Sequence, residues 1–151
     1  MTTANPDLSV RLHGDENQVA IVTLTRPAKR NALNDGLILA IRDAFQNLPA
    51  SVKAAVIDGE GEHFCAGLDL SELSERDAAE GVFHSRMWHA ALECVEKGTV
   101  PVIAALHGAV VGGGLELASA CHIRVADEST FYALPEGTRG IFVGGGGAVR
   151  V

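Results

Sequence analysis

Two glutamates near glycine-rich segments are the first candidates for proton-transfer chemistry. Glu116 closely follows a glycine triplet at 112–114, and Glu136 lies in a proline-stiffened turn at 133–137. A carboxylate and a carboxylic acid at close range can act as base and acid, because like charges disfavour double ionisation and raise one pKa. Each residue also has a simpler explanation when taken alone. Glu116 can be a carboxylate that the helix dipole favours, and Glu136 can be a solvated turn charge.

Two glycine loops can supply backbone N–H groups beside these carboxyls. The triplet at 112–114 leads from a predicted strand into a predicted helix, where unpaired amides and the helix dipole suit an oxyanion. The segment 64–70 has small residues and a helix start near Leu70, so it can present a further N–H. A tight packing turn and an ordinary loop are the simpler alternatives. Neither segment matches a Walker A loop or a dinucleotide-binding fingerprint.

Other reactive residue types lack the spacing of a known site. The histidines share no metal-ligand spacing and are expected to be ordinary surface or core residues: His63, His84, His89 and His122. Two serines, Ser85 and Ser119, lack the nucleophile elbow of serine hydrolases. Three cysteines form no CxxC pair and are expected to be reduced thiols: Cys65, Cys94 and Cys121. The sequence therefore predicts no metal site.

Composition restricts the class of protein. The chain has 151 residues, 47% of them hydrophobic and 21% charged, which fits one globular domain. A net charge of −7 without a long basic run argues against nucleic acid as the main partner. The N-terminus lacks a secretory signal, and His107, Glu116 and several glycines interrupt the apolar stretch at 100–118. We therefore expect a cytoplasmic protein with no membrane span.

Alternating strands and helices must position the candidate residues. We expect strands at 8–12, 18–24, 53–58, 101–106, 123–126 and 130–132. Helices are expected at 35–47, from near Leu70, at 79–97 and at 115–120, with a glycine loop at 107–114. Asn34 caps the first helix, Pro49 stops it, and Trp88 faces the core from the longest helix. The order predicts an α/β fold.

Four stretches in this order resemble the crotonase (enoyl-CoA hydratase/isomerase) superfamily. They are Arg26-Pro27 with Asn31-Ala32-Leu33, then 64–69, then 112–117, and finally Pro135-Glu136 leading to the glycines at 144–147. The resemblance implies an α/β spiral of repeated ββα units. Family chains are longer, and the run 144–151 looks like the opening of a loop and helix. Residues 1–151 are therefore expected to be an N-terminal fragment of the spiral core, without its C-terminal turns and helices.

The resemblance also implies roles for individual residues. The backbone N–H groups of Leu68 and Gly113 match those that polarise a thioester carbonyl. Glu116 and Glu136 match the hydratase glutamates, with Glu116 holding or deprotonating water and Glu136 giving a proton to the α-carbon. Gly144 matches a position whose N–H orients the water. Coupled titration leaves the division between the two glutamates open.

Coenzyme A is implied as part of the substrate, so no separate cofactor is expected. Two segments match the coenzyme A contacts of the family: Ala28, Lys29 and Arg30, and then Ala66, Gly67, Leu68, Asp69 and Leu70. Lys29 and Arg30 suit the phosphates, and the carbonyls around Ala66 match the part that receives the adenine. The alternative for the basic pair is a solvated surface loop.

The resemblance predicts a lyase that adds water syn across the α,β double bond of an enoyl-CoA thioester, as in fatty acid metabolism. The segment 132–143 resembles a methylthioacryloyl-CoA hydratase subgroup, although Val143 replaces a proline common in the family. An enoyl-CoA isomerase and a non-catalytic acyl-CoA-binding scaffold remain alternatives. A homo-oligomer, either a trimer or a hexamer built as a dimer of trimers, is expected.

Overall fold

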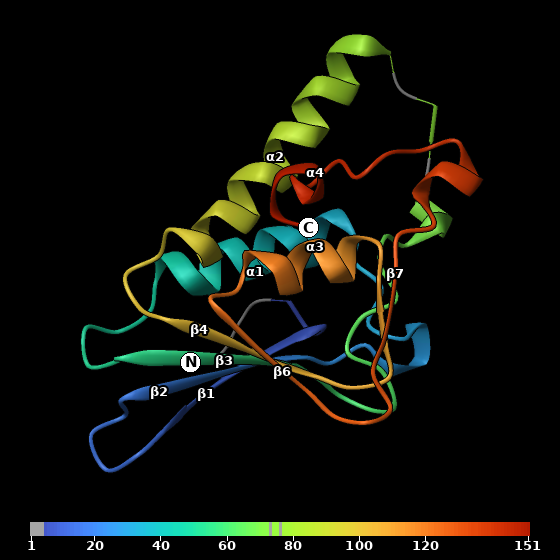
Figure 1. Ribbon diagram of the computed structural model, residues 1–151. Helices are drawn as coiled ribbons and strands as arrows, with labels where there is room; N and C mark the ends of the chain where they lie inside the picture. The colour runs from blue at the N-terminus through green and yellow to red at the C-terminus, as the bar shows by residue number, and fades with distance from the viewer. Residues whose placement is uncertain (1–4, 73, 76) are drawn as a thin grey trace.

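The computed structural model describes residues 5–72, 74–75 and 77–151, which form a twisted sheet with helices above one face (Figure 1). The sheet has strand order β1-β2-β3-β4-β6. Its strands are β1 (Leu8–His13), β2 (Val19–Leu24), β3 (Ala54–Gly59), β4 (Val102–Leu106) and β6 (Ile123–Ala126). β1 and β2 form an antiparallel hairpin, and every later pair in this sheet is parallel. The predicted α/β class is confirmed.

A second, two-stranded sheet pairs β5 (Ala109–Val111) with β7 (Phe131–Ala133) in parallel. The α-helices are α1 (Asp35–Gln46), α2 (Ala78–Glu96), α3 (Gly113–Ala120) and α4 (Gly147–Arg150). Single 3₁₀ turns form η1 (Pro27–Lys29), η2 (Leu70–Glu72) and η3 (Glu136–Arg139). No helix in the described ranges is long and apolar enough to cross a membrane.

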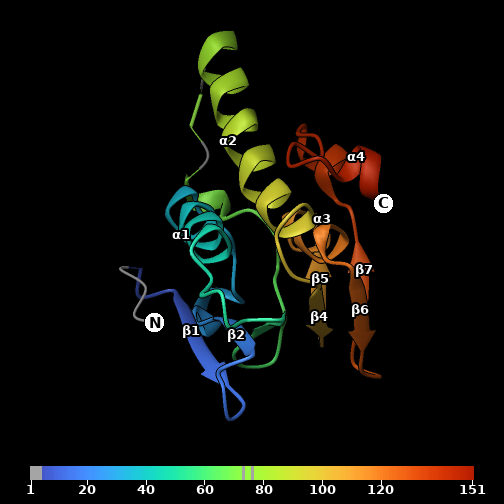
Figure 2. The ribbon, with the colours of Figure 1, turned by 90° about the vertical axis from the view of Figure 1, so that its left-hand side faces the viewer.

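Successive ββα units stack as turns of a spiral. β4, β5 and α3 follow one another along the chain, and β6, β7 and η3 repeat the order one layer further on (Figure 2). The preceding turn runs from β3 through two bridge residues, Cys65 and Leu68, to α2. Cys65 pairs with Val110 of β5, and Leu68 pairs with Leu33. The expected spiral of ββα units is present.

The helices carry the start signals that the sequence indicates. The Asn34 side chain accepts a hydrogen bond from the Leu37 amide at 2.8 Å, which confirms the predicted cap of α1. α2 begins with a reciprocal capping box, in which Asp77 and Glu80 each bind the other's backbone amide. Trp88 of α2 is buried, as expected.

The core lies between the sheet and the helices that cover it. Alternate residues of β2 are fully buried, which is the period expected when one sheet face meets the core. The buried faces of α1 and α2 complete the same cluster: Leu37, Ile38, Ile41 and Phe45 from α1, and Ala91, Leu92 and Val95 from α2. This rigid layer supports the loops at the ends of β3, β4 and β6.

The predicted glycine loop at 107–114 is wrong in part, because it contains strand β5. Three residues are too few to show a periodic pattern, and Val110 is buried by neighbours far away in sequence, Cys65 and Tyr132. α3 begins at Gly113 rather than at Leu115, after Gly112 reverses the chain with a φ of 53°. The helix expected near Leu70 is the single turn η2.

Candidate active site

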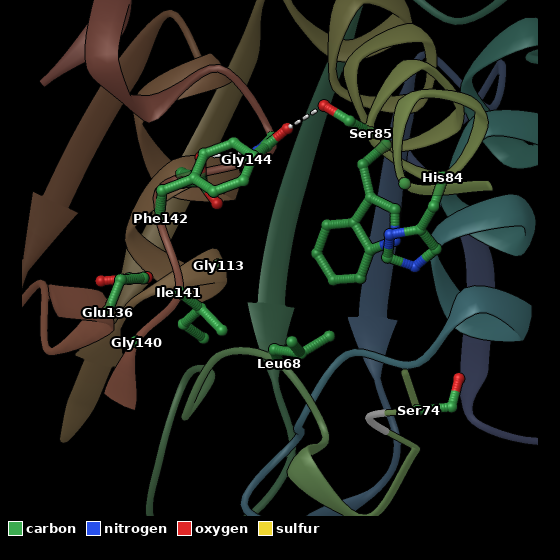
Figure 3. Close-up of a pocket in the computed structure, with 14 residues that line it drawn as sticks. Leu68, Ser74, His84, Ser85, Gly113, Glu136, Gly140, Ile141, Phe142 and Gly144 are labelled. Atoms are coloured by element: carbon green, nitrogen blue, oxygen red, sulfur yellow. Dashed lines mark hydrogen bonds between the residues drawn. The ribbon is translucent and has the colours of Figure 1, made fainter. Parts of the chain in front are cut away.

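Glu116 and Glu136 line the same pocket, which has a volume of about 400 Å³ (Figure 3). Glu116 lies in the first turn of α3, and Glu136 opens η3. Their exposed fractions are 3% and 9%, so Glu136 is not the solvated turn charge that its sequence context allows, and Glu116 is a buried carboxyl at the start of a helix. Two consecutive turns of the spiral therefore bring together residues that are twenty positions apart (136 − 116 = 20).

Glu116 is held by the glycine loop before α4. The amides of Gly145 and Gly147 each donate a hydrogen bond of 2.8 Å to Oε1 of Glu116. Burial raises the pKa of Glu116, the two amides oppose this rise, and the charge of Glu136 adds to it, while His89 opposes it. The carboxyl thus stays able to exchange a proton above its ordinary range.

Close approach to both carboxyls requires residues without side chains. A Cβ atom added to Gly147 would lie 2.8 Å from Cγ of Glu116, and one added to Gly145 would lie 3.2 Å from Oε2. A Cβ atom added to Gly112 would lie 2.6 Å from Oε1 of Glu136. The glycine runs in the sequence therefore reflect close packing around the two carboxyl groups.

Glu136 has a different environment. Its Oε2 atom is buried, and no hydrogen-bond partner for it occurs among the described residues. Its backbone carbonyl accepts a bond from the Ile141 amide at 3.1 Å, which fixes the main chain of the turn. A buried polar atom without a protein partner costs free energy unless a ligand or solvent satisfies it. Glu136 therefore lines the pocket with a carboxyl oxygen that no described protein group satisfies.

Two residues whose backbone amides are candidate donors, Leu68 and Gly113, line the same pocket from different loops. Leu68 and Leu33 form a parallel β-bridge. The residues on either side of Leu68 make its two hydrogen bonds: the Gly67 carbonyl accepts from the Leu33 amide at 2.7 Å, and the Asp69 amide donates to the Leu33 carbonyl at 2.8 Å. The Leu68 N–H therefore points away from Leu33. A Cβ atom added to Gly113 would lie 3.6 Å from the Leu68 nitrogen. In the described part of the chain neither the Leu68 nor the Gly113 amide has a protein acceptor. Such paired donors can polarise a carbonyl group.

Gly144 also lines this pocket. Its carbonyl accepts a hydrogen bond of 3.1 Å from the Ser85 hydroxyl, drawn as a dashed line in Figure 3. The contribution of the Gly144 N–H to water binding remains a prediction.

The two segments expected to contact coenzyme A lie side by side. The Ala66 amide donates a bond of 2.9 Å to the Arg30 carbonyl, which joins the loops. Ala28, Lys29 and Arg30 are exposed, and neither basic side chain forms an ion pair within the described ranges. Of these segments, only Leu68 lines the pocket. The basic pair thus lies outside the pocket, beside the loop that carries the Leu68 amide.

Asp69 and Leu70 differ in their surroundings. The Asp69 carboxylate is 2.7 Å from the Arg26 guanidinium and accepts bonds from the amide and hydroxyl of Ser71. The Ser71 hydroxyl, followed by Arg26, lowers the pKa of Asp69 to about 2. The Asp69 side chain therefore fixes the loop from within, and its backbone amide is bonded to the Leu33 carbonyl. Leu70 is exposed, while Gly67 is buried against Val111.

Sequence reasoning missed the polar side chains that support the loops. Asn31 is fully buried: its oxygen accepts from the Arg26 amide at 2.9 Å, and its amide group donates to the carbonyls of Glu60 and His63. One signal was available in α2. Gly81, His84, Ser85 and Trp88 follow helical spacing and all line the pocket. Two of them, His84 and Ser85, are polar where a core face would be apolar.

Among the described residues no group of three or more His, Cys, Asp or Glu side chains is placed to hold a metal ion. The cysteines are free, and burial raises the pKa of the Cys65 and Cys121 thiols to about 12. These two thiols are therefore protonated at neutral pH.

A ββα spiral that gathers carboxyl groups and backbone amides around one pocket defines a protein of the crotonase class. The chain belongs to the enoyl-CoA hydratase/isomerase family, which it matches over residues 14–151. It is similar to 2,3-dehydroadipyl-CoA hydratase of Escherichia coli K12, with 39% identity over 140 residues that cover 90% of this chain and 53% of the relative.

Solved structures agree with this assignment. A proposed enoyl-CoA hydratase from Rhodopseudomonas palustris CGA009 is 58% identical, with a TM-score of 0.93 over 99% of this chain and 57% of that one. A proposed enoyl-CoA hydratase from Thermobifida fusca YX, solved in complex with CoA, is 26% identical with a TM-score of 0.83, over 92% of this chain and 57% of that one. The chain spans about half the length of the curated relatives it matches.

Proposed function

We propose that this chain carries the catalytic centre of an enoyl-CoA hydratase. The observation that carries the proposal is the convergence, in one pocket, of two buried glutamates and two loop-borne amides. Hydration of a conjugated thioester needs a base for water, an acid for the α-carbon and stabilisation of the developing enolate. These four groups supply all three requirements, and family membership supports the same reading.

The proposed reaction begins with the thioester carbonyl accepting hydrogen bonds from the Leu68 and Gly113 amides. Glu116 takes a proton from water, whose oxygen forms a bond to the β-carbon. The electron pair of the double bond moves through the α-carbon to the carbonyl oxygen, which becomes an enolate. Glu136 then gives its proton to the α-carbon and restores the carbonyl. Both glutamates line one pocket, and the proposed addition is syn, with water and proton reaching the same face of the double bond.

The backbone donors supply a large share of the acceleration in this scheme. Loss of one such donor costs roughly 3–4 kcal/mol of transition-state stabilisation in comparable oxyanion sites. Because amides do this work, the side chain at Leu68 is free to vary, and only its backbone position matters. The positive charges of Lys29 and Arg30, beside the Leu68 loop, are proposed to bind the phosphates of coenzyme A.

The full-length protein tests this proposal directly. Hydration of crotonyl-CoA, followed by the loss of enoyl-thioester absorbance, is expected for the wild type and should nearly disappear in Glu136→Gln. The variant should still bind the CoA ester, measured by calorimetry. Hydration retained by Glu136→Gln contradicts the assignment. Tight binding without turnover by the wild type favours a non-catalytic acyl-CoA scaffold instead.

An enoyl-CoA isomerase is the second candidate, because Glu136 has a carboxyl oxygen without a hydrogen-bond partner among the described residues. One free carboxylate can carry a proton from the α-carbon to the γ-carbon and needs no activated water. Product analysis with a 3-enoyl-CoA separates the two reactions. Isomerisation much faster than hydration favours the isomerase.

The finer assignments are also proposals. The substrate is methylthioacryloyl-CoA or a related short enoyl-CoA of fatty acid breakdown, and the protein is a cytoplasmic trimer or dimer of trimers. Kinetics on a panel of enoyl-CoA esters tests the substrate. A clear preference for straight-chain esters over the methylthio ester removes the subgroup assignment. Light scattering of the purified full-length protein measures the oligomer.

A further inference from the structure

The glycine loop that binds Glu116 is itself tethered to α2 at two carbonyl groups. The Ser85 hydroxyl donates to the Gly144 carbonyl at 3.1 Å. One guanidinium nitrogen of Arg150 donates to the Gly145 carbonyl at 2.9 Å. These carbonyls lie next to the Gly145 amide, which donates to Glu116. Contacts on the loop's carbonyl side therefore control where its amides point.

The Arg150 side chain is fixed rather than free. Its Nε and its second terminal nitrogen donate to one carboxylate oxygen of Glu96, at 3.0 and 2.7 Å. The Arg150 side chain is only 10% exposed, and its hydrogen bond lowers the pKa of Glu96. The planar guanidinium thus spans from Glu96 of α2 to the loop carbonyl, a geometry that suits arginine and not lysine.

The two tethers come from one face of α2. Ser85 and Glu96 are eleven residues apart (96 − 85 = 11), about three helical turns, so they project from the same side. The capping box and the buried residues of α2 hold this helix against the core. It is therefore a rigid support for the loop.

One tether acts on the same peptide group that binds the carboxyl. The Gly144 carbonyl and the Gly145 N–H belong to one planar peptide unit. Its carbonyl accepts from Ser85 while its N–H donates to Glu116. Hydrogen bonds in such a chain polarise one another, so the Ser85 contact both orients and strengthens the amide donor.

We propose that Ser85 and the Glu96–Arg150 ion pair are positioning residues for Glu116, holding the glycine loop so that the Gly145 and Gly147 amides bind its carboxylate. The kinetic part of this inference rests on the proposed function, and the titration of Glu116 does not. Loss of either tether should loosen the two amide bonds. The ionised form of Glu116 then loses support, and its pKa rises.

Direct charge effects must be separated from positioning. The charged and titratable groups around Glu116 are Glu136 from η3, His89 from α2, and Glu96 with Arg150 behind the loop. By charge alone, Arg150→Gln would raise the pKa of Glu116 and Glu96→Gln would lower it. If these residues instead act by positioning the loop, both substitutions raise the pKa of Glu116. Ser85→Ala, which removes no charge, then raises this pKa as well. The sign of the Glu96→Gln shift therefore decides between the two explanations.

The experiment is a pH titration of the carboxyl carbons of ¹³C-glutamate-labelled full-length protein, with Glu116 assigned by its absence in Glu116→Gln. We expect Ser85→Ala, Glu96→Gln and Arg150→Gln each to raise the pKa of Glu116 by about 0.5–1 unit. The matched control is Glu93→Gln, which breaks the exposed Glu93–Lys97 pair at 3.1 Å on the same helix and should leave the titration unchanged.

Kinetics on crotonyl-CoA complete the test. The three variants should lower kcat about tenfold with KM within about twofold, and should move the acidic limb of the pH profile upward. A downward pKa shift in Glu96→Gln, or full recovery by Arg150→Lys, overturns the positioning role. Expected titration shifts in a protein that does not hydrate enoyl-CoA would contradict the proposed function alone. Hydration with unshifted titrations would contradict this inference alone.

Discussion

The two glutamates of the pocket share burial but differ in how the protein holds them. Glu116 accepts two amide hydrogen bonds on one oxygen, from a loop that α2 tethers. Glu136 has a buried carboxyl oxygen with no partner among the described residues. One carboxyl is therefore held by two hydrogen bonds from the backbone, and the other has a buried oxygen that no described group satisfies.

This difference suits a division of labour. Backbone amides stabilise the ionised form of a carboxyl, which fits the role of base proposed for Glu116 despite its burial. An acid must deliver its proton to a carbon atom that offers no hydrogen bond beforehand, and a carboxyl oxygen free of protein donors can do so. The environments thus support Glu116 as the group that activates water and Glu136 as the proton donor.

The largest expected effect comes from removing the carboxyl groups themselves. Glu116→Gln and Glu136→Gln should each lower kcat for hydration by about 10²–10⁴-fold, because each removes a general acid or base. The proposed roles of the two glutamates also predict that the two variants differ in a second reaction. Exchange of the α-protons of a saturated acyl-CoA with deuterated water should survive better in Glu116→Gln than in Glu136→Gln, as followed by NMR. The reverse order would exchange the two roles.

A smaller loss of activity is expected when a substitution displaces the glycine loop that donates hydrogen bonds to Glu116. Gly147→Ala places a Cβ atom 2.8 Å from Cγ of Glu116, whereas at Gly137, beside Glu136, an added Cβ has no described atom within 4 Å. We expect Gly147→Ala to lower kcat about 100-fold and the free energy of unfolding by about 1–3 kcal/mol. Gly137→Ala is the matched control and should change kcat less than about twofold. Equal losses in the two variants would remove the distinction between the two loops.

The pH dependence should report the raised pKa of Glu116. Hydration should fall as pH decreases through this pKa, which lies above the ordinary 4.5, because the base becomes protonated. The stability of the folded chain depends on pH in the opposite direction from the activity. The folded chain binds this proton more tightly than the unfolded chain, so stability is lost as pH rises from 4.5 through the raised pKa. Glu116→Gln should therefore gain thermal stability over the wild type towards neutral pH, with no gain below that range. A difference in Tm that does not vary with pH contradicts this account.

Much of the fold could be predicted from local pattern, and the reasons for the failures are physical. Asn34 and Pro49 bounded α1 correctly, because caps and breakers act within a few residues. β5 was missed because its burial comes from Cys65 and β7, which lie far away in sequence. The resemblance carried by the glycine motifs predicts Glu116, Glu136 and the two amide loops as site residues, and Leu68, Gly113 and both glutamates line one pocket.

The supporting contacts of the site could not be found in the same way. Ser85 is hydrogen-bonded to Gly144, which lies 59 residues further along the chain, and Arg150 is hydrogen-bonded to Glu96, which lies 54 residues earlier. Spacings of this size reflect the arrangement of helices in three dimensions and leave no periodic signal. Ser85 was considered only as a nucleophile, although its hydroxyl donates to the loop that holds Glu116.

The smallest expected effect lies outside the pocket, at the exposed basic pair. Lys29→Ala with Arg30→Ala should raise KM for an enoyl-CoA about two- to tenfold and leave kcat unchanged, because surface charges contribute little and act only on binding. The increase should shrink at high salt, which screens exposed charges. The decisive control is an enoyl thioester of N-acetylcysteamine, which has no phosphates and should be hydrated equally by both proteins. A matching loss with that substrate would place the effect in the pocket, where the Leu68 loop joins Arg30 through Ala66, and would show that the basic side chains act on the oxyanion amide rather than on phosphate.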